Sequence, residues 1–96
     1  MVSIDDTSYL GSIVISRVGR DGKREFVIVG LDNNSSESDI VYIADGRLRK
    51  IESPKKKKLK HLILTGKVSE KARSLITSGT LTNKCLHSIL NEYRQV

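Results

Sequence analysis

The stretch from Asp45 to Leu64, DGRLRKIESPKKKKLKHLIL, organises the rest of the chain. Asp45-Gly46 is a tight-turn signal, Pro54 interrupts the segment, and an apolar run closes it at Leu62–Leu64. From Arg47 to Lys60 it holds eight Lys or Arg residues and one Glu, a local charge of +7. Because the whole chain carries +6, all the other residues together sum to −1. Such a concentrated positive field is typical of a site that binds a polyanion.

Length and composition restrict the class of protein. Ninety-six residues predict one small domain, and 38% hydrophobic residues without Trp predict a modest, mainly aliphatic core. Cys85 is the single cysteine, which excludes an internal disulfide and a CxxC zinc site and suits a reducing compartment. The acidic start of the chain lacks signal-peptide features, and no apolar run is long enough to span a membrane. We therefore expect a cytoplasmic protein without a membrane partner.

The pattern along the chain predicts a mainly β fold. Residues 1–8 are polar and acidic and predict a flexible N-terminal tail. Five short segments predict strands, at residues 10–18, 25–31, 40–44, 47–51 and 61–64. Asp21-Gly22 predicts a hairpin turn between the first two strands, and residues 32–39 predict a polar loop. Because the connections leave no room for crossover helices, we expect a small five-stranded antiparallel barrel, closed or half-closed, over residues 9–66.

Residues 67–96 predict a helical extension of this barrel. Ser69 can cap a helix that continues through Ile76, and Gly79 stands at the usual left-handed stop position. Either Thr82 or Asn83 can cap a second helix. In that helix apolar residues recur with the spacing i, i+3, i+4, i+7, at Leu86, Ile89, Leu90 and Tyr93.

No residue pattern in the sequence predicts catalysis. Cys85 and His87 are two positions apart on a predicted helix and therefore point in different directions. We interpret Cys85 as a small apolar residue, and His61 as a phosphate or backbone contact, or simply an exposed residue, rather than a metal ligand. No carboxylate pair and no Gly-rich loop before a helix stands out. We therefore expect no catalytic residues, no cofactor, no metal and no enzyme activity.

The basic segment is the candidate binding site. A lysine run is often only a solvated surface, but this run lies inside the predicted fold and continues a strand on which Arg47 and Arg49 alternate outward. Few aromatic residues are free to stack on bases, which favours shape and backbone recognition of structured RNA. The predicted RNA contacts are Arg47, Arg49, Lys50, Lys55, Lys56, Lys57, Lys58, Lys60 and His61. Second-rank candidates flank the first hairpin turn, at Arg17, Arg20, Lys23 and Arg24.

Two series of residues resemble a known family. Residues 11–22, GSIVISRVGRDG, followed by FVIV at 26–29, resemble the KOW motif, which spans the first hairpin of an SH3-like barrel. Residues 42–52, YIADGRLRKIE, with PKKK at 54–57 and KHL at 60–62, resemble the small bacterial KOW-domain RNA-binding proteins. Those proteins are similar to large-subunit ribosomal proteins of archaea and eukaryotes. The resemblance covers roughly residues 10–94 and implies an SH3-like barrel that binds RNA or the ribosome.

Two functions from different classes follow from these observations. The first is a non-catalytic RNA-binding protein that docks its basic face on structured RNA. Ribosomal RNA is the expected target, with ribosomal or other ribonucleoprotein components as further partners, in either a permanent or an assembly role. The alternative is an SH3-like protein-interaction module whose basic face receives an acidic partner, such as a transcription or translation factor.

Overall fold

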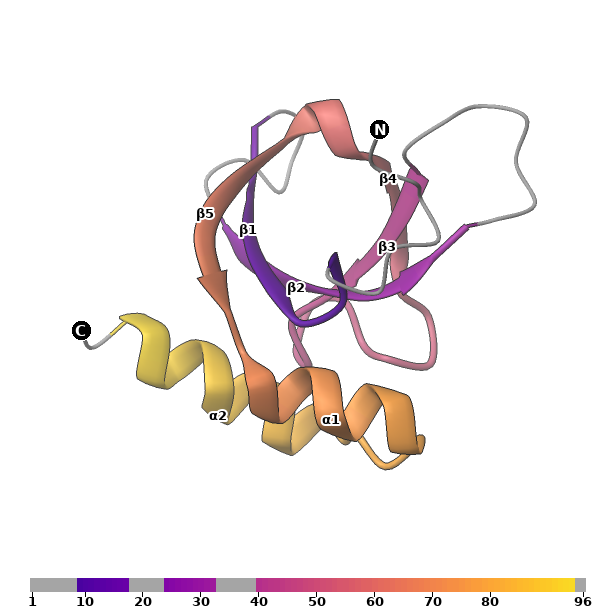
Figure 1. Ribbon diagram of the computed structural model, residues 1–96, viewed down its shortest axis with the longest axis vertical. Helices are drawn as coiled ribbons and strands as arrows, with labels where there is room; N and C mark the ends of the chain where they lie inside the picture. The colour runs from indigo at the N-terminus through magenta and orange to yellow at the C-terminus, as the bar shows by residue number, and fades with distance from the viewer. Residues whose placement is uncertain (1–8, 18–23, 33–39, 95–96) are drawn as a thin grey trace.

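The computed structural model describes residues 9–17, 24–32 and 40–94 (Figure 1). In chain order the elements are β1 (Ser12–Ser16), β2 (Glu25–Leu31), β3 (Ile40–Ala44), β4 (Lys55–Lys58), the 3₁₀ turn η2 (Leu59–His61), β5 (Leu62–Val68), α1 (Glu70–Ser78) and α2 (Asn83–Arg94). The strands form one antiparallel sheet with the order β4-β3-β2-β1-β5. The predicted mainly β fold with five antiparallel strands and two C-terminal helices is confirmed.

The sheet curls strongly, and its inner face carries one hydrophobic cluster (Figure 1). Alternate residues of a strand point to opposite faces, and directly paired residues share a face. Val14 pairs with Phe26, and Ile28 pairs with Ile43, so these side chains belong to the same face. The buried members of the cluster are Val14, Phe26, Ile28, Val41, Ile43 and Leu62. The cluster explains why these strands are rich in aliphatic residues.

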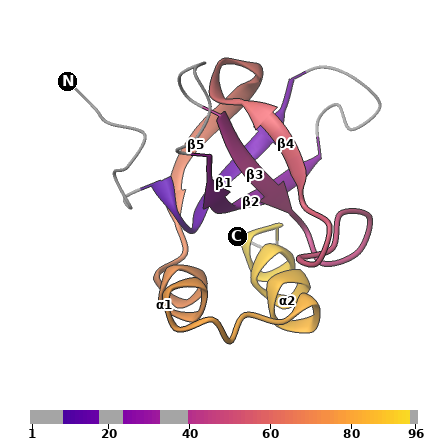
Figure 2. The same ribbon diagram turned by 90° about the vertical axis from the view of Figure 1, so that its right-hand side faces the viewer.

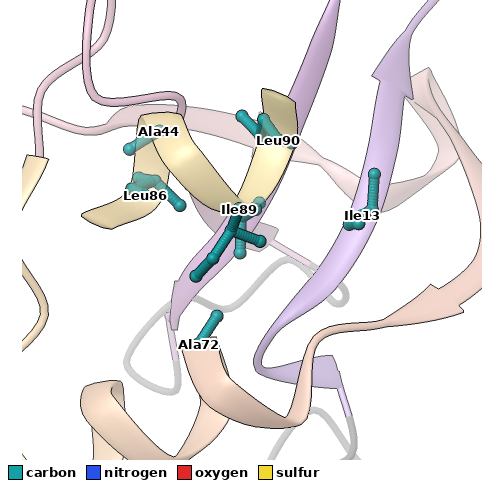
Figure 3. Close-up of a cluster of buried hydrophobic side chains, with 7 residues drawn as sticks. Ile13, Ala44, Ala72, Leu86, Ile89 and Leu90 are labelled. Carbon is teal, nitrogen blue, oxygen red and sulfur yellow. The ribbon is translucent and has the colours of Figure 1, made fainter. Parts of the chain in front are cut away.

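The two helices cover the outer face of the sheet, side by side (Figure 2). Ile13 pairs with Val27, which pairs with Ala44, and this row of residues meets the helices. Figure 3 shows the buried side chains of α1 and α2 that face the row, namely Ala72, Leu86, Ile89 and Leu90. Because both faces of the sheet are buried, β2 is apolar at successive positions instead of alternating with polar residues.

The predicted helix ends are confirmed by side-chain and backbone geometry. Ser69 Oγ accepts a hydrogen bond from Ala72 N at 3.1 Å, and Gly79 ends α1 with a left-handed φ of 75°. Thr82 Oγ1 accepts from Cys85 N at 3.1 Å, so Thr82 is the residue that caps α2. The second capping candidate, Asn83, instead binds the segment that precedes β4.

The fourth strand predicted at residues 47–51 is wrong, because these residues belong to an irregular turn that runs from Asp45 to Pro54 (the basic turn). Asp45 Oδ1 accepts hydrogen bonds from Arg47 N and Arg49 N, both at 2.9 Å. The backbone N–H groups of Asp45 and Gly46 both donate to Arg49 O. Backbone groups bound within a turn cannot join a sheet ladder.

The lysine run forms the fourth strand instead. Residues 40–43 of β3 pair with residues 58–55 of β4 in reverse order, which makes β4 one edge of the sheet. The fifth strand, predicted at residues 61–64, begins at Leu62 and continues to Val68, where it still pairs with Ser12. The first strand is shorter than predicted, because it covers only Ser12–Ser16. The predicted tail at residues 1–8, the Asp21-Gly22 turn and most of the acidic loop lie outside the described residues.

Candidate nucleic-acid interface

The four lysines of β4 are divided between the two faces of the sheet. Lys55 lies opposite Ile43 and Lys57 opposite Val41, so both belong to the inner face. Lys56 and Lys58 alternate with them and therefore belong to the outer face, where Lys56 lies opposite Tyr42. The lysine run is thus an edge that presents cations in two directions, and it is not a single flat surface.

Three of these lysines are half-buried, and Lys56 is exposed. Long lysine stems cover apolar surface while the ammonium group stays in water, which allows a strand made only of lysines to pack on β3. Lys56 Nζ lies 3.2 Å from Asp32 Oδ2, with the two side chains 54% and 11% exposed. An ion pair of this kind contributes little stability, but it offsets part of the positive charge on the outer face of β4.

Beyond β4 the cations continue around η2 to the end of β1. Arg17 N donates to His61 O at 3.1 Å, and Arg17 Nη1 lies 3.4 Å from Lys60 O. These two contacts place three predicted RNA contacts beside one another, although Arg17 is more than forty residues away in sequence from the other two. Figure 1 shows η2 at the end of the sheet opposite the helices.

Arg47, Arg49 and Lys50 lie at the other end of β4, in the basic turn beside α2 (Figure 2). The expectation that Arg47 and Arg49 alternate outward on a strand is wrong, because the carboxylate of Asp45 holds the backbone of both residues in a turn. The side chains of Arg47 and Lys50 are exposed, and that of Arg49 is half-buried. Arg20 and Lys23 lie outside the described residues.

Together these groups form a stripe that follows the edge strand β4 and the connection from β4 to β5, which we call the basic edge. It consists of the basic turn, β4, η2 and the end of β1. Its described cationic residues are Arg17, Arg47, Arg49, Lys50, Lys55, Lys56, Lys57, Lys58 and Lys60, with His61 beside them. Most of the residues singled out in the sequence therefore lie on a continuous path.

Arg24 lines a pocket of about 400 Å³ between the start of β2, the basic turn and α2, which it shares with Arg47 of the basic edge. Two residues of this pocket, His87 and Arg94, were missed by the sequence reasoning. They are seven positions apart on α2 and therefore share a helical face. The seven-residue spacing of His87 and Arg94 indicates this shared face in the sequence, but the sequence does not show which other element the face meets.

Three further features of the described residues concern metal ligands, Cys85 and membrane spans. The described His, Cys, Asp and Glu residues form no group of three that could hold a metal ion. Cys85 is half-buried and packs on the cluster between sheet and helices, as expected of a small apolar residue. In the part of the chain that the structure describes, each helix is too short or too polar to cross a membrane.

The sequence matches no protein-family model and no curated protein.

Proposed function

We propose that this chain is a non-catalytic RNA-binding protein with a KOW-type, SH3-like barrel that docks its basic edge on structured RNA, with ribosomal RNA as the expected target. The observation that carries the proposal is the basic edge. Nine described Lys and Arg residues follow one side of the sheet, while the residues outside the segment from Arg47 to Lys60 sum to −1. A positive stripe on an otherwise balanced surface suits a phosphate backbone.

The sheet supports the barrel part of this proposal. β1 pairs with both β2 and β5, so the last strand returns to the side of the first. The strong curl brings the two edge strands toward each other, and η2 connects them (Figure 1). The residues that resemble the KOW motif include the paired strands β1 and β2, as expected of a motif that spans the first hairpin.

The length of the basic edge suits an RNA strand. A strand rises about 3.3 Å per residue, so β4 alone is roughly 13 Å long. The basic turn and η2 extend the stripe at both ends, so it can contact several successive phosphates. Double-stranded RNA is recognised mainly through its shape and its backbone, and such recognition needs cations at fixed positions more than aromatic side chains.

A purely structural role for the lysines explains fewer residues of the basic edge than RNA binding does. Lysines on an edge strand prevent the strand from pairing with another sheet, and β4 is an edge strand. This role accounts for the lysines of β4. It does not account for Arg17 and Lys60 around η2, or for the arginines of the basic turn.

The test compares two variants that lose the same number of charges. The first, K57Q/K58Q/K60Q, changes the basic edge. The second, K67Q/K71Q/K84Q, changes exposed lysines on β5, α1 and α2. Affinity for a fluorescent hairpin of large-subunit ribosomal RNA is measured by anisotropy over a range of salt concentrations.

We expect the first variant to bind at least about tenfold more weakly and its log–log salt slope to flatten by about 0.7–0.9 per lost phosphate contact. The RNA affinity and the salt slope of the second variant should stay close to those of the unmodified protein. Equal affinities for the two variants would contradict RNA docking at the basic edge. Binding of a polyglutamate peptide as tight as that of the RNA, lost in the first variant, would favour the acidic-partner alternative.

A further inference from the structure

We propose that the pocket between β2, the basic turn and α2 binds a single phosphate group. It is lined by Arg24, Glu25, Asp45, Arg47, Leu48, His87 and Arg94. Where that phosphate belongs to RNA, the inference rests on the proposed RNA-binding function. The binding chemistry itself is the same for a phosphate group of a small molecule.

The pocket has the size and the donors that a phosphate needs. Its volume of about 400 Å³ lies within the range of roughly 300–1,000 Å³ that is usual for small-ligand sites. Three arginines and one histidine reach it from three different elements. Guanidinium groups bind phosphate oxygens through pairs of parallel hydrogen bonds, and donors from several directions suit a tetrahedral anion better than a planar one.

Both carboxylates in the lining already accept hydrogen bonds, Glu25 from the lining residue Arg94 and Asp45 from backbone N–H groups. The Glu25 carboxylate accepts from Arg94 Nε, which connects the end of α2 to the start of β2. Asp45 is only 5% exposed, and its Oδ1 accepts from Arg47 N and Arg49 N. Three arginines against two carboxylates leave the lining positive, and the two carboxylates hold the arginine-bearing segments in place.

Close packing of the basic turn on α2 holds the backbone that carries Arg47 beside the helix that carries His87 and Arg94. Gly46 has a φ of +83°, and a Cβ atom built there would lie 2.3 Å from Asn83 O and 3.2 Å from His87 N. No side chain therefore separates the turn from the helix at this point, and Arg47 follows directly. A pocket whose parts are already in position loses less conformational entropy when an anion binds.

The experiment uses the full chain and inorganic phosphate as the probe. Arginine Nε–Hε and histidine ring signals are followed by NMR during a phosphate titration, with sodium chloride at the same ionic strength as the reference. We expect saturable shifts at Arg47, His87 and Arg94 with phosphate but not with chloride. R47Q and, separately, H87Q should weaken phosphate binding about tenfold or more, the effect of losing a hydrogen bond to a charged group.

K71Q is the control, because Lys71 is an exposed cation on α1 that belongs neither to the pocket lining nor to the basic edge. Phosphate binding should be unchanged in K71Q. NMR shifts that are equal in phosphate and in chloride would overturn the proposed phosphate site. Phosphate binding that is intact in both R47Q and H87Q would overturn it as well. Unchanged NMR signals of the core methyl groups in each variant establish that the fold is intact.

An RNA titration separates the possible sources of the phosphate. An RNA hairpin that displaces inorganic phosphate, and that binds R47Q more weakly, would assign the pocket to an RNA backbone phosphate. Phosphate binding that RNA leaves undisturbed would support the pocket and assign it to a small phosphorylated molecule. The two proposals can also fail separately. If phosphate does not bind but K57Q/K58Q/K60Q still loses RNA binding, the phosphate pocket is overturned and the proposed function is left intact.

Discussion

Asn83, the first residue of α2, receives a hydrogen bond from the backbone of Ile51 in the basic turn, with 2.8 Å between Ile51 N and Asn83 Oδ1. The same side chain donates from Nδ2 to Glu52 Oε1 at 2.7 Å. One amide thus satisfies a backbone N–H and a carboxylate that lie more than thirty residues away in sequence. This contact connects the basic turn to the helices, and the helices are packed on the sheet.

Replacing this amide should destabilise the protein. Asn83→Ala leaves a part-buried N–H without its acceptor, and we expect the free energy of unfolding to fall by about 1–3 kcal/mol. Asn91→Ala is the control, since Asn91 is exposed on the same helix. Urea denaturation followed by circular dichroism measures both variants. Equal midpoints would show that the contact contributes nothing to stability.

Gly46 and Gly79 separate the cost of a left-handed backbone from that of a steric clash. Both have positive φ, 83° and 75°, but an added Cβ would collide with Asn83 O only at Gly46 and would meet no atom within 4 Å at Gly79. We expect Gly79→Ala to cost about 1–2 kcal/mol, the penalty of the left-handed region alone. Gly46→Ala should cost clearly more, measured by thermal unfolding. Similar melting temperatures would contradict the close packing of the turn on α2.

Removing the acidic partner of Lys56 should strengthen RNA binding. Asp32→Asn abolishes a negative charge 3.2 Å from the ammonium group, so the outer face of β4 becomes more positive. Stability should change by less than about 1 kcal/mol, because the pair is largely solvated on the lysine side. Glu92→Gln makes the same change in net charge at an exposed site on α2. Anisotropy at low salt should show a larger gain in affinity for the Asp32 variant; an equal gain would indicate only a net-charge effect.

Truncating a side chain that is buried between sheet and helices should cost far more stability than truncating an exposed one. Leu90 is fully buried between α2 and the sheet, whereas Leu64 on β5 is 51% exposed. Leu90→Ala leaves a cavity, and we expect a loss of about 2–5 kcal/mol. Leu64→Ala removes the same atoms from a solvent-exposed position and should lower the free energy of unfolding by less than about 1 kcal/mol. Urea midpoints test the ranking, and a larger loss for Leu64 would contradict it.

The sequence predicted best what depends on neighbouring residues. Ser69 caps a helix through an atom three residues away, and Gly79 ends that helix through its own backbone. The spacing of Leu86, Ile89 and Leu90 predicts an apolar helix face, and this prediction does not depend on which element packs against that face. The fourth strand was misplaced because lysine has a low preference for strands, and pairing with β3 outweighed that preference.

By itself, therefore, the sequence determined the mainly β fold class, the two ends of α1 and the concentration of positive charge between Arg47 and Lys60. Each of these depends on local spacing or on composition. Only the tertiary structure decided which face each lysine of β4 occupies, and that Arg24, Arg47, His87 and Arg94 surround one pocket. The physical reason is that strand register and helix docking depend on burying apolar side chains that are far apart in sequence, and no local pattern encodes that choice.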